Sequence, residues 1–195
     1  EELFESFITN PRFLYSAVYG YTNYDVIDFF ETAGVKTKME RGGRMFPLSD
    51  HSSDIIRALE QQMKKAGAFK EYAGEFWTAP ETRPYMRVRY TYFDVLISCG
   101  MMRQAISEGQ RLLELCESDD LGVRYQMMHL YVFMEDELHA LALHKQFDSY
   151  EETQMLLPLA VLYYKLNQFD KAEDYIKRLA KANKDTKKFL RAAAH

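Results

Sequence analysis

The sequence has few of the residues that build covalent or metal-bound frameworks. Its 195 residues include only two cysteines, Cys99 and Cys116, which are 17 positions apart and form no CxxC pair. This usage argues against a disulfide framework and against a thiolate zinc site, and it favours a reducing, cytoplasmic location. The chain has only five prolines and nine glycines, so residues that break helices are rare and many helices can form.

Long apolar runs and an excess of basic charge are also missing. The longest apolar stretches, such as residues 156–164, are about half of the roughly 20 residues that a membrane-spanning helix needs, and no signal segment opens the chain. With 25 basic and 29 acidic residues the net charge is −4, which provides no basic face for nucleic acid. The composition, 47% hydrophobic and 28% charged, is typical of a soluble globular protein. We therefore expect neither a membrane nor a nucleic acid as a partner.

Residues 1–67 carry most of the turn signals and predict a small α+β segment. Asn10-Pro11 is a typical helix start, and Thr22 is a typical N-cap for the helix that follows. Apolar and polar residues alternate before Gly42-Gly43 and the chain returns after it, which predicts a hairpin. A last helix, capped by Ser49 or Ser52, is expected to end at Gly67. The predicted elements are helices at 11–19, 23–33 and 52–66 and strands at 35–40 and 45–47.

These residues resemble an internal stretch of the BaiN-type FAD-dependent oxidoreductases, which are NAD(P)/FAD-dependent flavoproteins. The resemblance lies in residues 10–17 (NPRFLYSA), in TN and DFFE within residues 22–31, and in ERGGRMFPLSD and SSD within residues 40–54. It implies a flavoprotein segment that normally follows a dinucleotide-binding start. The Gly-rich phosphate loop of that family is missing, because Gly42-Gly43 lies in a hairpin turn and is not a GxGxxG motif.

From about residue 83 the chain has a helical repeat. Ala105, Ala140 and Ala172 stand in similar contexts at intervals of 35 and 32 residues, which straddle the 34-residue tetratricopeptide (TPR) period. Nine positions before each alanine and seven positions after it, the residue is apolar in all three units. Small and large residues at this spacing let the two helices of a hairpin pack closely. We predict helices near 84–98, 101–117, 121–134, 136–148, 152–166 and 169–182, a capping helix at 184–193, and a start near Leu157 or a kink at Pro158.

Residues from about 70 onward resemble a second family, of bacterial TPR-like proteins. The resemblance is carried by Phe76-Trp77, by residues 81–89 (ETRPYMRVR) and by residues 121–125 (LGVRY). It implies the helical-hairpin fold and no particular chemistry. The two parts together predict a mainly α protein, a TPR-like α-solenoid with a small N-terminal α+β segment that contains one hairpin. The predicted domains are a flavoprotein-like fragment at 1–67, a linker and cap at 68–82, and the repeats with their capping helix at 83–195.

No group of residues predicts a catalytic or metal site. His139 and His144 are five positions apart, so they point to different faces of a helix, unlike the i, i+4 pair of a helical zinc site. Residues 51–54 (HSSD) contain the residue types of a hydrolytic triad, but neighbours at a helix start cannot converge on one substrate, and helix capping accounts for them better. The two cysteines are interpreted as buried structural thiols. The basic residues between Lys177 and Arg191 are interpreted as a solvated helix face.

We expect the first helix of each hairpin to line a concave binding groove. The groove residues assigned to a partner are Arg87, Tyr90, Asp94, Tyr125, His129, Phe133, Tyr164 and Lys165. TPR modules that clamp a C-terminal carboxylate use Lys and Asn at the fifth and ninth repeat positions, whereas Tyr90 and Asp94 hold those positions in the first repeat here. No carboxylate clamp is therefore predicted, and the aromatic and apolar anchors favour an extended or helical peptide.

The main prediction is a non-enzymatic scaffold that binds a protein or peptide partner and has no catalytic residue, no cofactor and no metal. The alternative is a fragment of a flavin-dependent oxidoreductase that lacks its own dinucleotide-binding loop and depends on FAD held by a partner chain. In the N-terminal part alone several apolar side chains would be partly bare, so that part is also expected to dock on the repeats or on a second copy of the chain. These side chains are Phe29, Phe30, Phe46, Ile55, Ile56 and Leu59.

Overall fold

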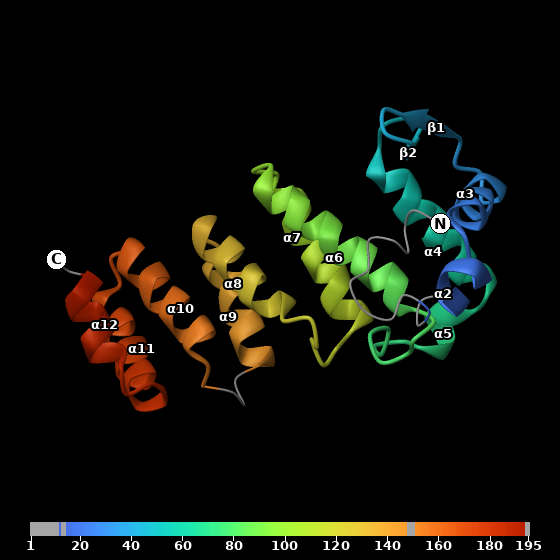
Figure 1. Cartoon of the computed structure of the whole chain (residues 1–195). Helices are drawn as coiled ribbons and strands as arrows, with labels where there is room; N and C mark the ends of the chain where they lie inside the picture. The colour runs from blue at the N-terminus through green and yellow to red at the C-terminus, as the bar shows by residue number, and fades with distance from the viewer. Residues whose placement is uncertain (1–11, 13–14, 148–150, 194–195) are drawn as a thin grey trace. The chain divides into compact units, whose positions relative to one another are not determined.

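The computed structural model describes residue 12 and residues 15–147 and 151–193 of the chain. These residues are mainly helical, with a two-stranded antiparallel sheet (Figure 1). This confirms a mainly α protein with a small hairpin. The described chain forms two compact units, Glu1–Tyr72 and Ala73–His195, and each is treated by itself below. The helix start expected at Asn10-Pro11 lies outside the described residues.

Short helices and one hairpin make up the N-terminal unit. A capping box begins the helix at Asn23–Thr32, because Thr22 Oγ1 accepts from the Asp25 amide at 3.3 Å while Asp25 accepts from the Thr22 amide at 2.6 Å. The strands pair from Thr37 opposite Pro47 to Glu40 opposite Arg44, and Gly42 and Gly43 have φ of 81° and 71° in the turn. The elements are α2 (Tyr15–Gly20), α3 (Asn23–Thr32), β1 (Thr37–Glu40), β2 (Arg44–Pro47), α4 (Ser52–Lys65) and α5 (Ala68–Glu71).

The described residues of this unit bury few apolar side chains. Its buried apolar side chains among the described residues are Val35, Ile56, Ala58 and Ala68. Phe29 and Phe30 are half-buried, and their rings meet edge to face with centroids 5.1 Å apart.

The N-cap of α4 differs from the expectation. His51 is the N-cap and its side chain makes no capping bond, so the prediction that Ser49 or Ser52 caps this helix is wrong. Ser52 is already the first helical residue, and the Ser49 hydroxyl accepts from the His51 amide at 3.2 Å and donates to the Asp54 carboxylate. The serine therefore holds the turn before the helix and does not cap its free amides.

The C-terminal unit is built from successive helix pairs (Figure 1). α6 packs on α7, α8 on α9 and α10 on α11, and adjacent pairs meet through α7 with α8 and through α8 with α10. The segment before α6 joins the unit through an antiparallel bridge between Glu75 and Cys116. The helices are α6 (Arg83–Ser98), α7 (Met102–Leu115), α8 (Val123–Phe133), α9 (Glu137–Gln146), α10 (Thr153–Lys165), α11 (Phe169–Ala182) and α12 (Thr186–Ala193).

The positions that define the predicted repeat are all buried. The three alanines lie in the second helix of each pair and have exposed fractions of 0–5%. The apolar residues nine positions before them and seven positions after them are buried as well. These residues are Leu96, Tyr131, Tyr163, Leu112, Phe147 and Leu179.

Each helix pair is joined by the same tight turn. The turn residues with left-handed backbone are Gly100, Glu135 and Asn167, with φ of 73°, 56° and 58°. In each turn this residue donates its amide to a carbonyl three positions back, and the next residue donates to a carbonyl five positions back. The pattern is the Schellman motif, which satisfies the last carbonyls of a helix. The residue after the one with left-handed backbone is also the N-cap of the second helix of the pair.

Pro158 does not end or begin a helix. α10 starts at Thr153 and runs through Pro158 to Lys165, so a start near Leu157 is wrong. Met155, Leu156 and Leu159 are completely buried on either side of the proline. Burial of these side chains outweighs the lost amide donor and holds the helix together across the proline.

Candidate functional site

The N-terminal unit has an open pocket of about 630 Å³. Its walls come from the segment before β1, from the turn after β2 and from one face of α4. A pocket of this size can hold a small organic molecule. The lining residues are Ala33, Gly34, Val35, Lys36, Leu48, Ser49, Asp54, Arg57, Ala58 and Gln61.

Asp54 and Arg57 form the polar side of this pocket. Arg57 Nη2 donates to Asp54 Oδ1 at 2.7 Å and lies 3.3 Å from Ser53 Oγ, so one turn of α4 fixes the guanidinium. Asp54 also accepts from the Ser49 hydroxyl. Lys36 has no ion pair within the described part of the chain, and only its carbonyl is engaged, by the Leu48 amide at 2.8 Å. The side chains of the lining therefore carry two positive charges and one negative charge.

The described residues of this unit do not form a dinucleotide site. Such a site uses a glycine-rich turn between a parallel strand and a helix, where backbone amides approach the pyrophosphate. Gly42 and Gly43 instead join the antiparallel strands β1 and β2, and the sheet described here contains no parallel pair. FAD therefore lacks a phosphate cradle within the described residues.

Three of the predicted groove residues come together in the C-terminal unit. Asp94, His129 and Phe133 line a hollow of about 530 Å³ with side chains of α6, α8 and the first turn of α7. Gln126 Nε2 donates to Asp94 Oδ1 at 2.9 Å across this hollow. Phe133 is 65% exposed at its edge.

The other predicted groove residues are engaged elsewhere in the unit. The Arg87 guanidinium lies 5.9 Å from the Trp77 ring centre, and the half-buried Tyr90 packs beside Phe93. Burial raises the pKa of Tyr90, with a further contribution from Asp94. The Tyr164 ring meets Phe169 edge to face, Lys165 pairs with Glu135 at 3.0 Å, and Tyr125 belongs to the network described next.

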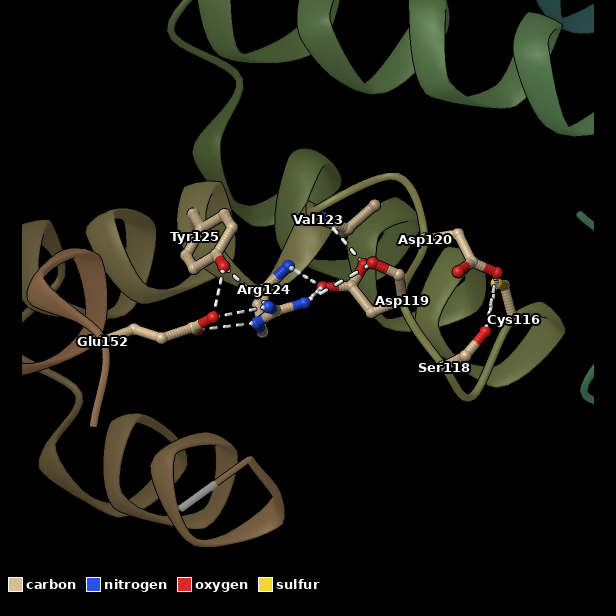
Figure 2. A network of polar contacts seen from close by, with 8 residues as sticks. All are labelled: Cys116, Ser118, Asp119, Asp120, Val123, Arg124, Tyr125 and Glu152. Carbon is tan, nitrogen blue, oxygen red and sulfur yellow. Dashed lines mark hydrogen bonds and ion pairs between the residues drawn. The ribbon is translucent and has the colours of Figure 1, made fainter. Parts of the chain in front are cut away.

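Arg124 is the centre of a polar network at the junction of the second and third helix pairs (Figure 2). Its Nη1 lies 2.9 Å from Asp119 Oδ2, in the loop before α8. Its Nε and Nη2 donate to the two oxygens of Glu152 at 3.2 and 3.0 Å, at the N-cap of α10. The Tyr125 hydroxyl donates to Glu152 at 2.8 Å and accepts from Arg124 at 2.6 Å. One side chain thus ties together segments that are up to 33 residues apart in the sequence.

The pKa values of the two carboxylates in this network are shifted in opposite directions. Burial raises the pKa of Asp119, although hydrogen bonds from the Arg124 and Val123 amides and the Arg124 side chain act against it. Burial also acts to raise the pKa of Glu152, but hydrogen bonds from Arg124 and Tyr125 outweigh it, and the result is lower than usual. The burial and the ion pairs of Asp119 and Glu152 account for both pKa shifts. We therefore interpret the network as a structural link between helix pairs.

The motif at residues 81–89 has a structural role. The Thr82 hydroxyl donates to the Phe76 carbonyl, and Arg83 donates to the carbonyls of Trp77 at 2.8 Å and Thr78 at 3.1 Å. The Phe76 ring is buried against Tyr85. These contacts fold the segment before α6 against the start of that helix, as capping of the first pair requires.

Arg89 and Glu108 form a second network that joins α6 to α7. Arg89 donates to both Glu108 oxygens, at 2.6 and 2.8 Å, and to the Tyr85 hydroxyl at 2.6 Å. Both charged side chains are only 10% exposed, so the pair is satisfied inside the helix contact. Nothing in the sequence distinguishes this pair, which is 19 residues apart, from the other arginines and glutamates.

The remaining candidates also have structural partners. His139 lies 2.7 Å from Asp136, and the buried His144 ring meets Tyr175 edge to face. No group of three or more metal-ligating side chains occurs within the described ranges. Cys116 is buried as expected, whereas Cys99 is exposed, because it is the C-cap of α6 and its backbone, not its side chain, closes the helix. None of the described helices combines the length and the apolar character needed to span a membrane.

Comparison with known proteins concerns the N-terminal part. The profile of a family described as "HI0933-like protein Rossmann domain" matches residues 1–85. No solved structure matches the chain. The match supports the flavoprotein-like resemblance of the N-terminal residues and gives no support to the TPR-like one. It also hints at FAD, so the expectation of no cofactor is not supported.

The prediction of a peptide-binding scaffold is therefore wrong as the main function. It rested on a regular arrangement of buried positions in the helix pairs, and such an arrangement specifies packing without specifying a ligand. The family match instead favours the alternative, a part of a flavin-dependent oxidoreductase. Sequence reasoning also missed the Lys36–Arg57 pocket and the Arg124 network, since each is assembled from segments that only the folded chain brings together.

Proposed function

We propose that residues 1–85 are a part of a flavin-dependent oxidoreductase that does not itself hold the dinucleotide. The observation that carries this proposal is the match of these residues to a Rossmann-domain flavoprotein family. FAD is the cofactor under this proposal, and its phosphates are bound by a glycine-rich loop outside the described residues. The hairpin and α4 then contribute a pocket wall of mixed polar and apolar character to the assembled enzyme.

The chain's own residues have limited tasks in such an enzyme. Asp54 and Arg57 hold each other in place, so they can orient a polar group of a bound molecule without transferring a proton. Val35 and Ala58 are buried beneath the pocket and give it an apolar floor. No redox-active side chain lines the pocket, and electron transfer is left to the flavin when it is bound.

A spectrum of the purified protein tests this function. The tagged full-length chain is isolated gently from its source cells, so that the chain that holds the dinucleotide stays bound to it. We expect a visible flavin band that elutes with this complex and FAD in its acid extract. Ile56→Asp, which places a charge at a buried position of the N-terminal unit, should abolish the band. Tyr164→Ala, at an exposed site in the C-terminal unit, is the control and should keep it. A colourless wild-type preparation that releases no FAD contradicts the proposal.

We also propose that residues 83–195 are TPR-like helical hairpins. The support is the regular burial of the nine repeat-defining positions and the recurrence of one turn type in all three pairs. An experimental structure of the full chain tests this, since successive pairs of a TPR array are related by a constant rotation. Pairs related by irregular rotations would contradict the assignment.

Two further proposals concern the state of the chain in the cell. The two cysteines are unpaired, which fits a reducing cytoplasm, and cell fractionation with an antibody against the chain checks that location. Self-association through the N-terminal unit is supported by exposed apolar side chains such as Tyr24 and Met39. Sedimentation at increasing concentration tests it, and Tyr24→Ser with Met39→Ser should shift the chain to monomer. A wild-type chain that stays monomeric at high concentration contradicts self-association.

A further inference from the structure

We infer that the pocket between the hairpin and α4 binds a small organic monoanion, a carboxylate on an apolar body. The inference is independent of the proposed redox function, because it concerns binding by residues 33–61 alone. It rests on three properties of the pocket, namely its size, the sign and number of its charges, and the distribution of its apolar walls.

The net charge of the pocket lining favours a ligand with a single negative charge. Lys36 and Arg57 are cationic, and Asp54 is the one acidic residue among the lining side chains. Asp54 is already satisfied by Arg57 at 2.7 Å and by the Ser49 hydroxyl, so its charge is largely neutralised within the pocket wall. One positive charge is left over, which matches a carboxylate better than a doubly charged phosphate.

Two donors are available to bind that charge. Only Nε and Nη2 of Arg57 have hydrogen-bond partners among the residues the structure describes, which leaves the donors of Nη1 unused. Lys36 comes from the segment before β1 and also lines the pocket, and its ammonium has no ion pair in the same part of the chain. A carboxylate between these two groups would accept from both, and charge-assisted hydrogen bonds of this kind are the strong ones.

The remaining walls favour an apolar body. Ala33, Val35, Leu48 and Ala58 contribute carbon surface, and Leu48 is 55% exposed at the rim. A volume of about 630 Å³ is far larger than a carboxylate group needs and fits a molecule with one or two rings. Burial of such a body against Leu48 adds the apolar contribution that a bare inorganic anion lacks.

Titration of the full-length chain with 2-naphthoate tests this inference, with the neutral 2-naphthamide as the matched ligand. Binding is followed by calorimetry and by backbone amide resonances, in the absence of flavin. We expect one site with a dissociation constant on the order of a millimolar or below, as is usual for a ligand of this size. The resonance shifts should be confined to residues 33–61, and the amide should bind more weakly. Absence of naphthoate binding, or equal binding of the two ligands, overturns the inference.

Charge variants separate this pocket from general attraction of anions. Lys36→Gln removes one exposed positive charge from the lining, and we expect the affinity for naphthoate to fall about two- to five-fold. Arg57→Gln should have an effect of at least that size, because it also uncovers the negative charge of Asp54. Lys70→Gln makes the same charge change on α5, outside the pocket lining, and should leave the affinity unchanged. Equal losses in Lys36→Gln and Lys70→Gln would contradict a specific site.

Discussion

Replacement of Arg124 by alanine removes the centre of the network between the second and third helix pairs. In the wild-type chain this side chain is 13% exposed, and Asp119, its partner in the preceding loop, is 1% exposed. The change leaves the Asp119 carboxylate buried without its cation. The change also removes the ion pair with Glu152 at the N-cap of α10. The stacking of the guanidinium on the rings of Tyr125, at 4.3 Å, and Phe147, at 5.2 Å, is lost as well.

The expected loss of unfolding free energy is about 3 kcal/mol. Removal of one partner of a buried ion pair costs about 3–5 kcal/mol, because the other charge stays buried. The lower end applies here, since Asp119 keeps hydrogen bonds from the Val123 amide at 2.7 Å and from the amide of residue 124 at 3.1 Å. The Glu152 side chain is 26% exposed and regains water, so its share is the about 0.2–1 kcal/mol of a surface pair.

The loss should also depend on pH. The pKa of Asp119 is already raised above its ordinary 3.8 by burial, and removal of Arg124 raises it further. A carboxyl group whose folded pKa is raised destabilises the fold as pH rises from the unfolded value through the folded value. Glu152 acts in the same sense, because its lowered pKa provides stability above about pH 4.5 that the variant lacks. The difference in unfolding free energy between wild type and variant should therefore be large at neutral pH, narrow as pH falls through the raised pKa of Asp119, and be small below about pH 4.

Urea unfolding followed by far-ultraviolet circular dichroism measures this difference at several pH values. Arg124→Lys keeps the charge but loses the two-pronged contact to Glu152, and it should fall between wild type and Arg124→Ala. Arg111→Ala removes the more exposed pair to Glu114 on α7 and is the control, with a loss below about 1 kcal/mol. If Arg124→Ala is no more destabilising than Arg111→Ala at neutral pH, the network does not brace the helix pairs.

Three smaller perturbations have equally definite outcomes. Gly109→Val should destabilise the C-terminal unit by about 1–3 kcal/mol in urea unfolding, because a β-carbon there would overlap the buried side chains of Met127 and Phe93; unchanged stability would mean that these side chains can move aside. Thr22→Ala removes the capping box of α3 and should cost about 0.5–2 kcal/mol, seen as faster amide hydrogen exchange in that helix, and an unaltered exchange rate would refute the capping role. Pro158→Ala should raise the unfolding free energy by roughly 1 kcal/mol. Proline inside a helix costs about 3 kcal/mol, whereas the loss of its two buried methylenes costs about 0.8 kcal/mol each. A lower thermal midpoint of the variant would contradict this.

Local signals in the sequence predicted most of the helices and the hairpin. Thr22 caps α3 and Gly100 turns the chain after α6 because both effects act over three to six residues, within reach of any sequence pattern. The spacing of Ala105, Ala140 and Ala172 likewise identified buried positions, since small residues are needed where paired helices approach.

Interactions between distant segments could not be predicted in the same way. Arg124 meets Glu152 only because successive pairs stack, and no pattern marks these two residues as partners. Of the two alternatives expected at Pro158, only the start near Leu157 is wrong, because the local effect of the proline, the loss of a donor, suggested it without the burial around Met155 and Leu156. The pocket of the N-terminal unit depends on how the hairpin lies on α4, which brings Lys36 to the same cavity as Arg57.

The repeated turn between paired helices bears on the order in which the C-terminal unit folds. Each turn is closed by hydrogen bonds that span at most six consecutive residues, so its loop-closure entropy is small and each pair can nucleate by itself. The left-handed backbone costs a non-glycine residue about 1–2 kcal/mol, so the turn at Gly100 forms more readily than those at Glu135 and Asn167. Folding should therefore start at α6 and α7 and spread toward the C-terminus as the later pairs dock on the growing end.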